Sequence, residues 1–312
     1  MEHQPVLVDR VVELLAPALA HGGVLVDATL GRAGHARRLL DSAPEAELVG
    51  IDRDPEALEA SRANLAAHEG RIRLVRDDFK NLAAVLERLG VQEARGVLLD
   101  LGVSSPQIDV AERGFSFRAD GPLDMRMDPT QPLSADVVVN GYSEEALAGV
   151  IRRYGEERFA RRIAAAIVAS RPVASTVALA EVVKAAIPAA TRRTGGHPAR
   201  RTFQALRIEV NRELEALEVA LPDAIESLSI GGRAVAISYH SLEDRIVKRR
   251  FVEEARGCEC PPDFPVCVCG AEARVRILTK RPAKPGAEEI AANPRAEAAK
   301  LRAVERLGNE GM

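Results

Sequence analysis

The stretch VLVDATLGRAGH, Val24 to His35, decides the predicted fold. It reads as a short buried strand from Val24 to Val26, then Asp27, then a tight turn at Gly31 to Gly34, and then a helix. In an open α/β sheet, a strand, a glycine-containing loop and a helix N-terminus form the first crevice, where a nucleotide-like cofactor binds. Only two glycines stand in this loop, so an ordinary βα turn is an alternative interpretation.

Length and composition indicate a globular protein of one large or two ordinary domains. The 312 residues are 46% hydrophobic and 29% charged, which is typical of a folded chain. No apolar run approaches the roughly 18–20 residues of a membrane helix, and MEHQPVLVDR lacks the pattern of a signal peptide. We therefore expect a cytoplasmic protein with no membrane partner. The net charge of -3 means that an anionic partner would be bound by local patches.

Strands alternate with helices through the first third of the chain. Further buried strands are predicted at Leu48 to Asp54, Ile72 to Val75 and Gly96 to Gly102. Helices are predicted between them, at Pro55 to His68 and Asn81 to Leu89. This alternation predicts an α/β fold with a parallel, doubly wound sheet.

The alternation stops after Gly102. The segment Ser104 to Pro132 is predicted to be a long loop, and such loops are usually functional or disordered. No strand is evident from there to Leu221, where we predict three helices, and a strand is predicted again at Arg233 to Ser238. A helical module is therefore inserted between the fourth and fifth strands. The three helices are predicted at Ser143 to Arg171, Thr176 to Ile187 and Arg201 to Leu221.

The two ends of the chain give weaker patterns. The first helix is predicted from Leu7 to Leu15, ending at Pro17. A final strand is predicted within Ala273 to Pro282, and the tail from Gly286 is expected to be partly mobile.

Two cofactors suit a strand, a loop and an acid after the second strand. A dinucleotide needs the G-x-G-x-x-G spacing, which the loop G-R-A-G-H does not have, whereas S-adenosylmethionine carries no phosphate. Asp52 or Asp54 would accept hydrogen bonds from ribose hydroxyls, although a helix cap before Pro55 is the favoured interpretation of Asp54. Asp27 and Asp100 could accept from an ammonium group or an adenine amine.

Several long blocks carry a resemblance to one family. They are DATLGRAGH, IDRDPEAL, LLDLGVSSPQIDVAERGFSFRADGPLDMRMDP, YGEERFARRIA, RTFQALRIEVN, ISYHSLEDRIVKRRF and, near the end, NPRA. They resemble the bacterial 16S rRNA cytosine-N4 methyltransferases, the small-subunit rRNA methyltransferase H family, which use S-adenosylmethionine. The resemblance implies a Rossmann-like class I methyltransferase fold with an inserted all-helical domain. We expect residues 1–133 and 207–312 to form the methyltransferase domain and 134–206 the substrate-recognition domain.

The resemblance also implies a set of cofactor contacts. Ala33 stands where the family's G-x-G-G-H loop usually has glycine, so its methyl is tolerable at negative φ but weakens binding at positive φ. For His35, a polar side chain pointing to solvent is the alternative. The implied cofactor contacts are Ala33, Gly34, His35, Asp52, Phe79, Asp100 and Gln107.

The reaction implied is methyl transfer to the exocyclic N4 of a cytosine in the small subunit, cytosine 1402 of the decoding centre. We expect Ser105 and the carbonyls near Pro106 to accept the amine hydrogens, and Asp100 to bind the cofactor or share that role. The loop resembles the D/S-P-P-Y motif only in part, because its aromatic is missing. Turn chemistry next to proline is the alternative for Ser104 and Ser105.

RNA binding needs phosphate contacts, and a basic segment from Arg192 to Arg212 could supply them. A second basic run, RIVKRR, lies at Arg245 to Arg250. Phe115, Phe117 and Tyr239 are candidates for stacking on a flipped base or for the core. DMRMDP is either a lid or a packed loop. The expected substrate contacts are Arg192, Arg193, Arg200, Arg201, Arg207 and His240, the last alternatively a cap.

All four cysteines lie in CECPPDFPVCVC. Two C-x-C pairs can close a tetrahedral thiolate site for a structural zinc ion, although C-x2-C is the usual spacing. Reduced thiols in a loop are the alternative. The residues are Cys258, Cys260, Cys267 and Cys269.

The expected function is therefore an rRNA methyltransferase acting on 16S rRNA in the small ribosomal subunit. Two alternatives stay open: a methyltransferase of DNA or protein with the same cofactor, and a non-catalytic RNA-binding assembly factor. A homodimer is also an open alternative.

Overall fold

The computed structural model describes residues 5–189, 196–257, 260, 269 and 272–308. The chain divides into two compact units, which we describe separately. Residues 1–102 and 214–312 form the sheet unit, and residues 103–213 form the helical unit. The helical unit is thus larger than the segment 134–206 expected from the sequence.

The sheet unit is built on seven strands in the order β3-β2-β1-β4-β5-β7-β6. The first five of these run parallel, and β7 pairs antiparallel with both β5 and β6. The strand order reverses between β1 and β4, and this switch point is where ligands bind in open α/β sheets. The prediction of a Rossmann-like α/β fold is confirmed. The strands are β1 (Gly23–Asp27), β2 (Ala46–Asp52), β3 (Ile72–Arg76), β4 (Ala94–Asp100), β5 (Leu228–Ser238), β6 (Val275–Ile277) and β7 (Lys300–Arg306).

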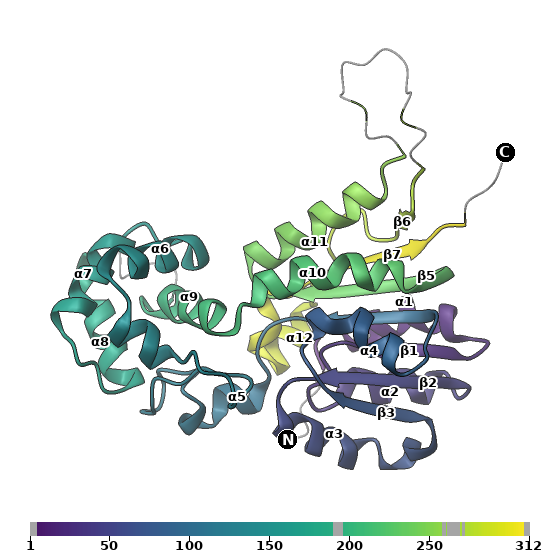
Figure 1. Ribbon diagram of the computed structural model, residues 1–312, viewed down its shortest axis with the longest axis horizontal. Helices are drawn as coiled ribbons and strands as arrows, with labels where there is room; N and C mark the ends of the chain where they lie inside the picture. The colour runs from purple at the N-terminus through teal and green to yellow at the C-terminus, as the bar shows by residue number, and fades with distance from the viewer. Residues whose placement is uncertain (1–4, 190–195, 258–259, 261–268, 270–271, 309–312) are drawn as a thin grey trace. The chain divides into compact units, whose positions relative to one another are not determined.

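The sheet drawn in Figure 1 is covered by two layers of buried apolar side chains. Successive side chains of a strand point to opposite faces, so Leu25 packs in one layer and Val26 in the other. Because both faces are covered, the strands read as nearly continuous apolar runs. The helices of this unit are α1 (Val8–Leu19), α2 (Gly34–Ser42), α3 (Pro55–Asn64), α4 (Leu82–Arg88), α10 (Glu213–Glu226), α11 (Ser241–Glu254) and α12 (Ala287–Ala292), with short 3-10 turns η1 (Ala66–Arg71), η2 (Phe79–Asn81) and η6 (Pro294–Ala298).

The structure corrects both chain ends. Helix α1 continues past Pro17 to Leu19. The tail from Gly286, which we expect from the sequence to be partly mobile, contains β7, whose Leu301, Ala303 and Val304 are buried within the sheet. In the sequence of this strand, KLRAVER, charged residues stand between and beside the apolar ones, so its apolar pattern is not evident. No helix in the described part of the chain is long and apolar enough to cross a membrane.

The helical unit has its own core, and its described residues contain no strand. The single helix expected from Ser143 to Arg171 is two helices, because the chain turns at Glu156 with φ 47°. The helix expected from Arg201 likewise ends at Arg212, where φ is 48°. The elements are α5 (Ser105–Asp109), η3 (Ala111–Arg113), the π-helical turn η4 (Val137–Gly141), α6 (Glu144–Gly155), α7 (Ala160–Ala169), α8 (Thr176–Ala186) and α9 (Arg200–Asn211).

The long loop belongs to the helical unit because hydrogen bonds tie it there. Asn211 donates through Nδ2 to the Met125 carbonyl at 2.7 Å and accepts from the Met127 amide at 2.8 Å. Met125 is fully buried in the helical core, and Thr176 donates its amide to the Gly121 carbonyl at 2.9 Å. These contacts tie the long loop to the unit that begins at residue 103, and DMRMDP is a packed loop within that unit.

Candidate active site

Three acidic residues gather at the carboxyl edge of the sheet, next to the switch point. Asp27, Asp52 and Asp100 are the last residues of β1, β2 and β4, which are neighbours in the sheet. Parallel strands end at one edge, so the three carboxylates come together although they lie far apart in sequence. All three are among the binding residues predicted from the sequence.

Asp52 is oriented by the cofactor loop and by its own turn. Its Oδ2 accepts from the Gly31 amide at 2.8 Å and its Oδ1 from the Asp54 amide at 2.9 Å. Burial raises the pKa of Asp52, and the two amide hydrogen bonds oppose that shift. Each carboxylate oxygen keeps a further lone pair, so Asp52 can still accept from a ligand hydroxyl.

Asp27 is the most deeply buried of the three acids. It is 2% exposed, and its Oδ1 accepts from the Thr29 amide at 3.2 Å. The pKa of Asp27 is raised to about 8, chiefly by burial; the Thr29 hydrogen bond opposes this rise, and the charges of Asp100 and Asp52 contribute to it. A cationic ligand group at this edge would relieve the repulsion among the three carboxylates.

Asp100 is held by three groups of the sheet unit. Its amide donates to Thr29 Oγ1 at 2.6 Å. The Tyr239 hydroxyl donates to Oδ1 at 2.8 Å, and His35 Nδ1 lies 3.5 Å from Oδ2. The carboxylate therefore has a fixed direction before any ligand binds.

His35 does not point to solvent, which was the alternative weighed from the sequence. The residue is buried, and its Nε2 donates to the Val6 carbonyl at 2.8 Å. That bond directs Nδ1 toward Asp100. The Leu7 amide in turn donates to Glu289 Oε1 at 2.6 Å, so residues from both ends of the chain position this imidazole.

The cofactor loop has one strained residue and one that must be glycine. Ala33 caps α2 with φ 60° and is fully buried, so the positive φ that the sequence left open is present. At Gly34 a Cβ would lie 2.5 Å from Pro5 Cγ, which leaves no room for a side chain. The loop thus approaches the N-terminal segment as closely as its backbone allows.

Tyr239 packs its ring against the sheet core, which is one of the two roles weighed from the sequence, and its hydroxyl serves the acid cluster. Burial raises the pKa of its hydroxyl well above the usual value, and the Asp100 charge adds to this, so the group stays a hydrogen-bond donor. A Cβ at Gly102, whose φ is 99°, would lie 3.2 Å from the Tyr239 ring. Gly102 therefore gives the ring its place beside the end of β4.

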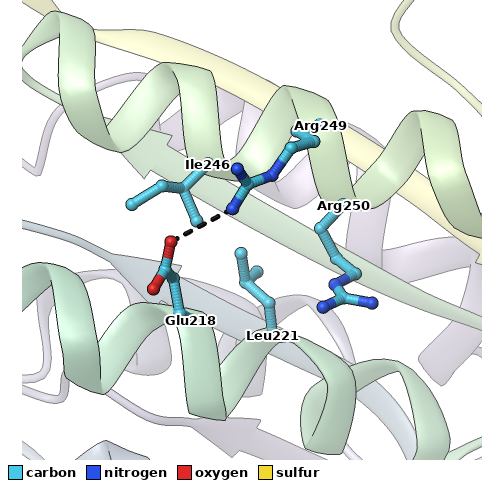
Figure 2. A pocket seen from close by; sticks show the side chains of 5 residues that line it. All are labelled: Glu218, Leu221, Ile246, Arg249 and Arg250. Carbon is cyan, nitrogen blue, oxygen red and sulfur yellow. Dashed lines mark hydrogen bonds and ion pairs between the residues drawn. The ribbon is translucent and has the colours of Figure 1, made fainter.

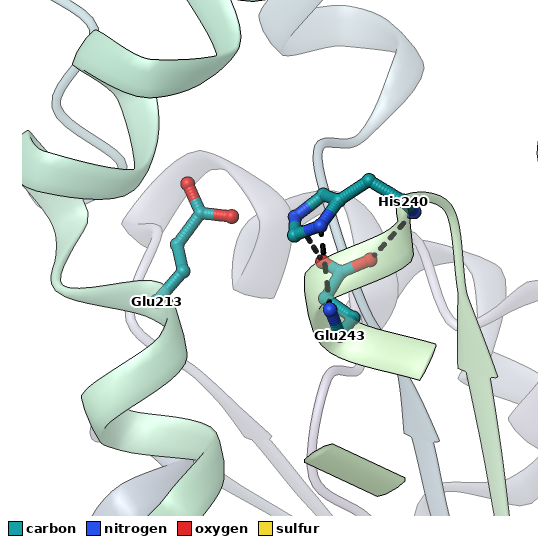
Figure 3. Close-up of side chains that lie close together, drawn as sticks. All are labelled: Glu213, His240 and Glu243. Carbon is teal, nitrogen blue, oxygen red and sulfur yellow. Dashed lines mark hydrogen bonds and ion pairs between the residues drawn. The ribbon is translucent and has the colours of Figure 1, made fainter. Parts of the chain in front are cut away.

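His240 begins α11 as its cap (Figure 3). Its Nδ1 accepts from the Glu243 amide at 3.3 Å, and Glu243 Oε2 accepts from the amides of Tyr239 and His240 at 2.8 and 3.1 Å. This capping box satisfies amides at the helix start that would otherwise lack partners. Of the two roles weighed for His240, the cap is present, here of a helix.

Phe79 and Gln107 were also expected to contact the cofactor. Phe79 begins η2 after β3 and packs partly buried against the sheet core. In the helical unit, buried Gln107 accepts the Ser104 amide at 3.0 Å and completes the capping box of α5. Pro106 stands in the first turn of that helix, and the Ser105 side chain lies outside the described residues.

The expected phosphate contacts divide into three groups. Arg192 and Arg193 lie outside the described residues, while Arg200 and Arg201 are exposed on α9. Arg207 makes a bidentate ion pair with Glu213, both bonds at 2.8 Å, and its side chain is only 14% exposed. The Arg207 guanidinium is therefore occupied by an ion pair inside the helical unit.

The predicted thiolate site falls largely outside the described residues. Cys258 and Cys267 are not among them, and Cys260 is half-buried while Cys269 is exposed. The zinc expectation therefore stays a prediction.

A pocket of about 210 Å³ lies elsewhere in the sheet unit, between α10 and α11 (Figure 2). Its charged walls neutralise each other, because Arg249 pairs with Glu218 at 3.1 Å. None of the three acids lines it. We therefore place the candidate active site at the acid cluster.

The acid cluster suits a ligand with cationic groups and hydroxyls and without phosphates. Negative charge on these acids would repel a pyrophosphate, and the loop lacks the glycines that bring backbone amides close to one. S-adenosylmethionine carries a sulfonium, an ammonium and a ribose diol, which match these acceptors. The residues present therefore fit this cofactor.

Sequence reasoning missed the groups that orient the acids. Thr29, Glu243 and Glu289 carried no signal, since each is an ordinary polar residue in a turn or a first helical turn. Tyr239 was noticed for its ring and not for its hydroxyl. The partner of that hydroxyl is Asp100, and the two residues meet only because β4 pairs with β5.

Comparison with known proteins gives consistent matches over the whole chain. The model of the MraW methylase family matches residues 1–307. Three similar relatives carry the name "Ribosomal RNA small subunit methyltransferase H". The protein of Heliobacterium modesticaldum is 52% identical over 98% of both chains. That of Halothermothrix orenii is 49% identical over 99% of this chain and 100% of its own. That of Thermobifida fusca is 53% identical over 97% and 93%.

Proposed function

The chain belongs to the MraW methylase family, and from this premise we propose that it transfers a methyl group from S-adenosylmethionine to a cytosine N4 in 16S rRNA. The target is cytosine 1402 in the decoding centre of the small ribosomal subunit, and the enzyme works in the cytoplasm. The observation that carries the proposal is the acid cluster beside a loop unsuited to phosphates. The relatives named for methylation of small-subunit RNA support the choice of substrate.

The acids have separate roles in this proposal. Asp52, already fixed by the Gly31 and Asp54 amides, accepts from the ribose hydroxyls. Asp27 and Asp100 face the cationic part of the cofactor, whose sulfonium supplies an electrophilic methyl group. The other cofactor contacts we assign from the family resemblance are Ala33, Gly34, His35, Phe79 and Gln107.

The cytosine amine is a weak nucleophile because its lone pair is delocalised into the ring. For transfer, the amine nitrogen must lie in line with the methyl group at about 3–3.5 Å. Groups that accept hydrogen bonds from the amine hydrogens localise its lone pair on the nitrogen. From the family resemblance we assign this role to Ser105 and the carbonyls near Pro106, with Asp100 sharing it. Arg200 and Arg201, with the segment at Arg192 and Arg193, bind RNA phosphates.

A methyl-transfer assay tests this proposal. Purified protein, radiolabelled S-adenosylmethionine and small subunits from cells lacking the modification should yield N4-methylcytosine at one position in 16S rRNA. Ser105→Ala should slow a single turnover strongly and leave cofactor affinity unchanged, whereas Asp52→Asn should weaken cofactor affinity first. Label in DNA or protein would favour a related methyltransferase, and RNA binding without transfer would favour an assembly factor. An unchanged single-turnover rate in Ser105→Ala would remove that residue from the mechanism.

A further inference from the structure

Helices α6 and α7 of the helical unit follow each other in the chain (Figure 1), and five arginines lie in the sequence at and around the turn between them. The sequence there is RRYGEERFARR, residues 152–162. All five are exposed, because the helices pack their apolar faces inward and turn sharply at Glu156, where φ is 47°. We call this surface the arginine corner, and it consists of Arg152, Arg153, Arg158, Arg161 and Arg162.

None of these five side chains forms an ion pair or a hydrogen bond within the described part of the chain. Arg153 and Arg158 instead lie near aromatic rings, with Cζ 5.8 Å from the Tyr154 centroid and 4.6 Å from the Phe159 centroid. A guanidinium over a ring keeps its N–H groups directed outward at its edge. These donors are therefore open to a ligand.

Acidic residues in the segment do not cancel its charge. Five arginines stand against Glu156 and Glu157, which leaves a net charge of +3 over residues 152–162. The Glu157 side chain is 7% exposed, accepts the Phe159 amide at 2.9 Å and lies 3.8 Å from the guanidinium of Arg201. The chain as a whole carries -3, so this positive surface is local.

The basic run on α11 provides a contrast within the same protein. There Arg249 pairs with Glu218 at 3.1 Å (Figure 2). It also lies 3.9 Å from Glu253. Arg250 lies 3.5 Å from Glu254 and 3.8 Å from Glu253. A phosphate would have to displace these carboxylates, whereas at the arginine corner it would displace only water.

We propose that the arginine corner binds the phosphate backbone of the substrate RNA. This inference rests on the proposed function and adds a surface outside the basic segment from Arg192 to Arg212. All five cations are arginines, whose planar forks bind phosphate oxygens in pairs. Such contacts fix the position of an RNA without reading its bases.

Salt dependence of RNA binding tests the inference. The full-length triple variant Arg158→Gln, Arg161→Gln, Arg162→Gln is titrated without cofactor against unmodified small subunits, between about 50 and 200 mM KCl. Each lost phosphate contact lowers the magnitude of the negative slope of log affinity against log salt by about 0.7–0.9, so for three lost contacts we expect it to fall by about 2–3. Circular dichroism and cofactor affinity should match the wild type. The matching lysine triple variant should keep the slope.

The matched control is Arg249→Gln, Arg250→Gln on α11, which should leave the slope unchanged. An unchanged slope in the folded corner variant overturns the inference, as does an equal decrease in the control. If the corner variant instead loses binding to anionic phosphatidylserine vesicles and keeps its slope on subunits, the occupant is a membrane and the inference fails. Binding is measured without cofactor, so the two proposals can fail separately. If the corner variant lowers the magnitude of the slope but the wild-type protein transfers no methyl group, the proposed reaction is refuted and the RNA-binding surface is not.

Discussion

The hydroxyl of Tyr239 donates a hydrogen bond to Oδ1 of Asp100 across 2.8 Å. The two residues are 139 positions apart in sequence and meet because β4 and β5 pair in parallel, with Asp100 opposite Ile237. Asp100 is thereby given one direction before substrate or cofactor arrives. In preorganised sites such fixed acceptors contribute most to catalysis.

Replacing Tyr239 with phenylalanine should weaken cofactor binding or slow methyl transfer by about 10-fold or more. A hydrogen bond to a charged group contributes about 1.5–3 kcal/mol, and the ring keeps its packing against Gly102. Calorimetry with the cofactor and single-turnover rates would separate the two effects. Tyr142→Phe is the matched control, since its hydroxyl donates to Glu209 at 2.9 Å within the helical unit. If Tyr239→Phe and Tyr142→Phe change cofactor affinity and single-turnover rate by the same factors, Tyr239 has no positioning role.

Asp27 should make the protein less stable as pH rises from about 4 to 8. Its pKa is raised from 3.8 to about 8, so in this window the folded state holds a proton that the unfolded state has released. The stabilisation is complete below the unfolded value and is lost as pH approaches the folded value. Asp27→Asn should flatten the pH dependence of the unfolding free energy by about 1.4 kcal/mol per pH unit.

Urea denaturation across this pH range would measure the slope for Asp27→Asn. Asp9→Asn serves as the control, because its side chain is 93% exposed. A slope as steep in Asp27→Asn as in the wild type would contradict the assignment.

Ala33→Gly should change stability by less than about 1 kcal/mol, because two effects offset. Glycine relieves the left-handed backbone strain of about 1 kcal/mol, and it loses a buried methyl group that contributes about 0.8 kcal/mol. Ala33→Val should cost more than about 2 kcal/mol, since a β-branched residue suits neither φ 60° nor the closed site. Urea midpoints and cofactor affinity would be compared; a stable valine variant would argue against the positive φ.

Asp244 should anchor β7 to α11. Its carboxylate accepts from Arg302 at 2.7 Å and Lys300 at 3.1 Å. Burial acts to raise its pKa, but these two cations overcome that effect and the pKa is lowered. The stabilisation is therefore present above the unfolded pKa and lost as pH falls through the lowered folded value.

Asp244→Asn should lower the free energy of unfolding at neutral pH by about 2–3 kcal/mol. Amides of β7 should exchange faster in the variant. Asp9→Asn, which weakens a solvated pair with Arg38, should cost less than about 0.5 kcal/mol. Equal stability of the two variants would mean that the Asp244 network does not hold the last strand.

Local patterns in the sequence were sufficient for much of the fold. Apolar runs bounded by turns predicted β1, β2 and β4, because strands covered on both faces need no polar alternation. The cap at Asp54 was also predictable and is confirmed: its carboxylate accepts the Glu56 amide at 3.1 Å. Local patterns failed where the backbone turns without a glycine, as at Glu156 and Arg212, because the surrounding core imposes those angles.

The sequence by itself determined the order of strands and helices and placed Asp27, Asp52 and Asp100 at strand ends, since both depend on residues close together in the chain. Only the tertiary structure decided which groups orient them. The Glu289 bond to Leu7 spans 282 positions, and the Tyr239 bond to Asp100 depends on strand register. Such partners are chosen by packing and pairing across the whole sheet, which no local pattern encodes.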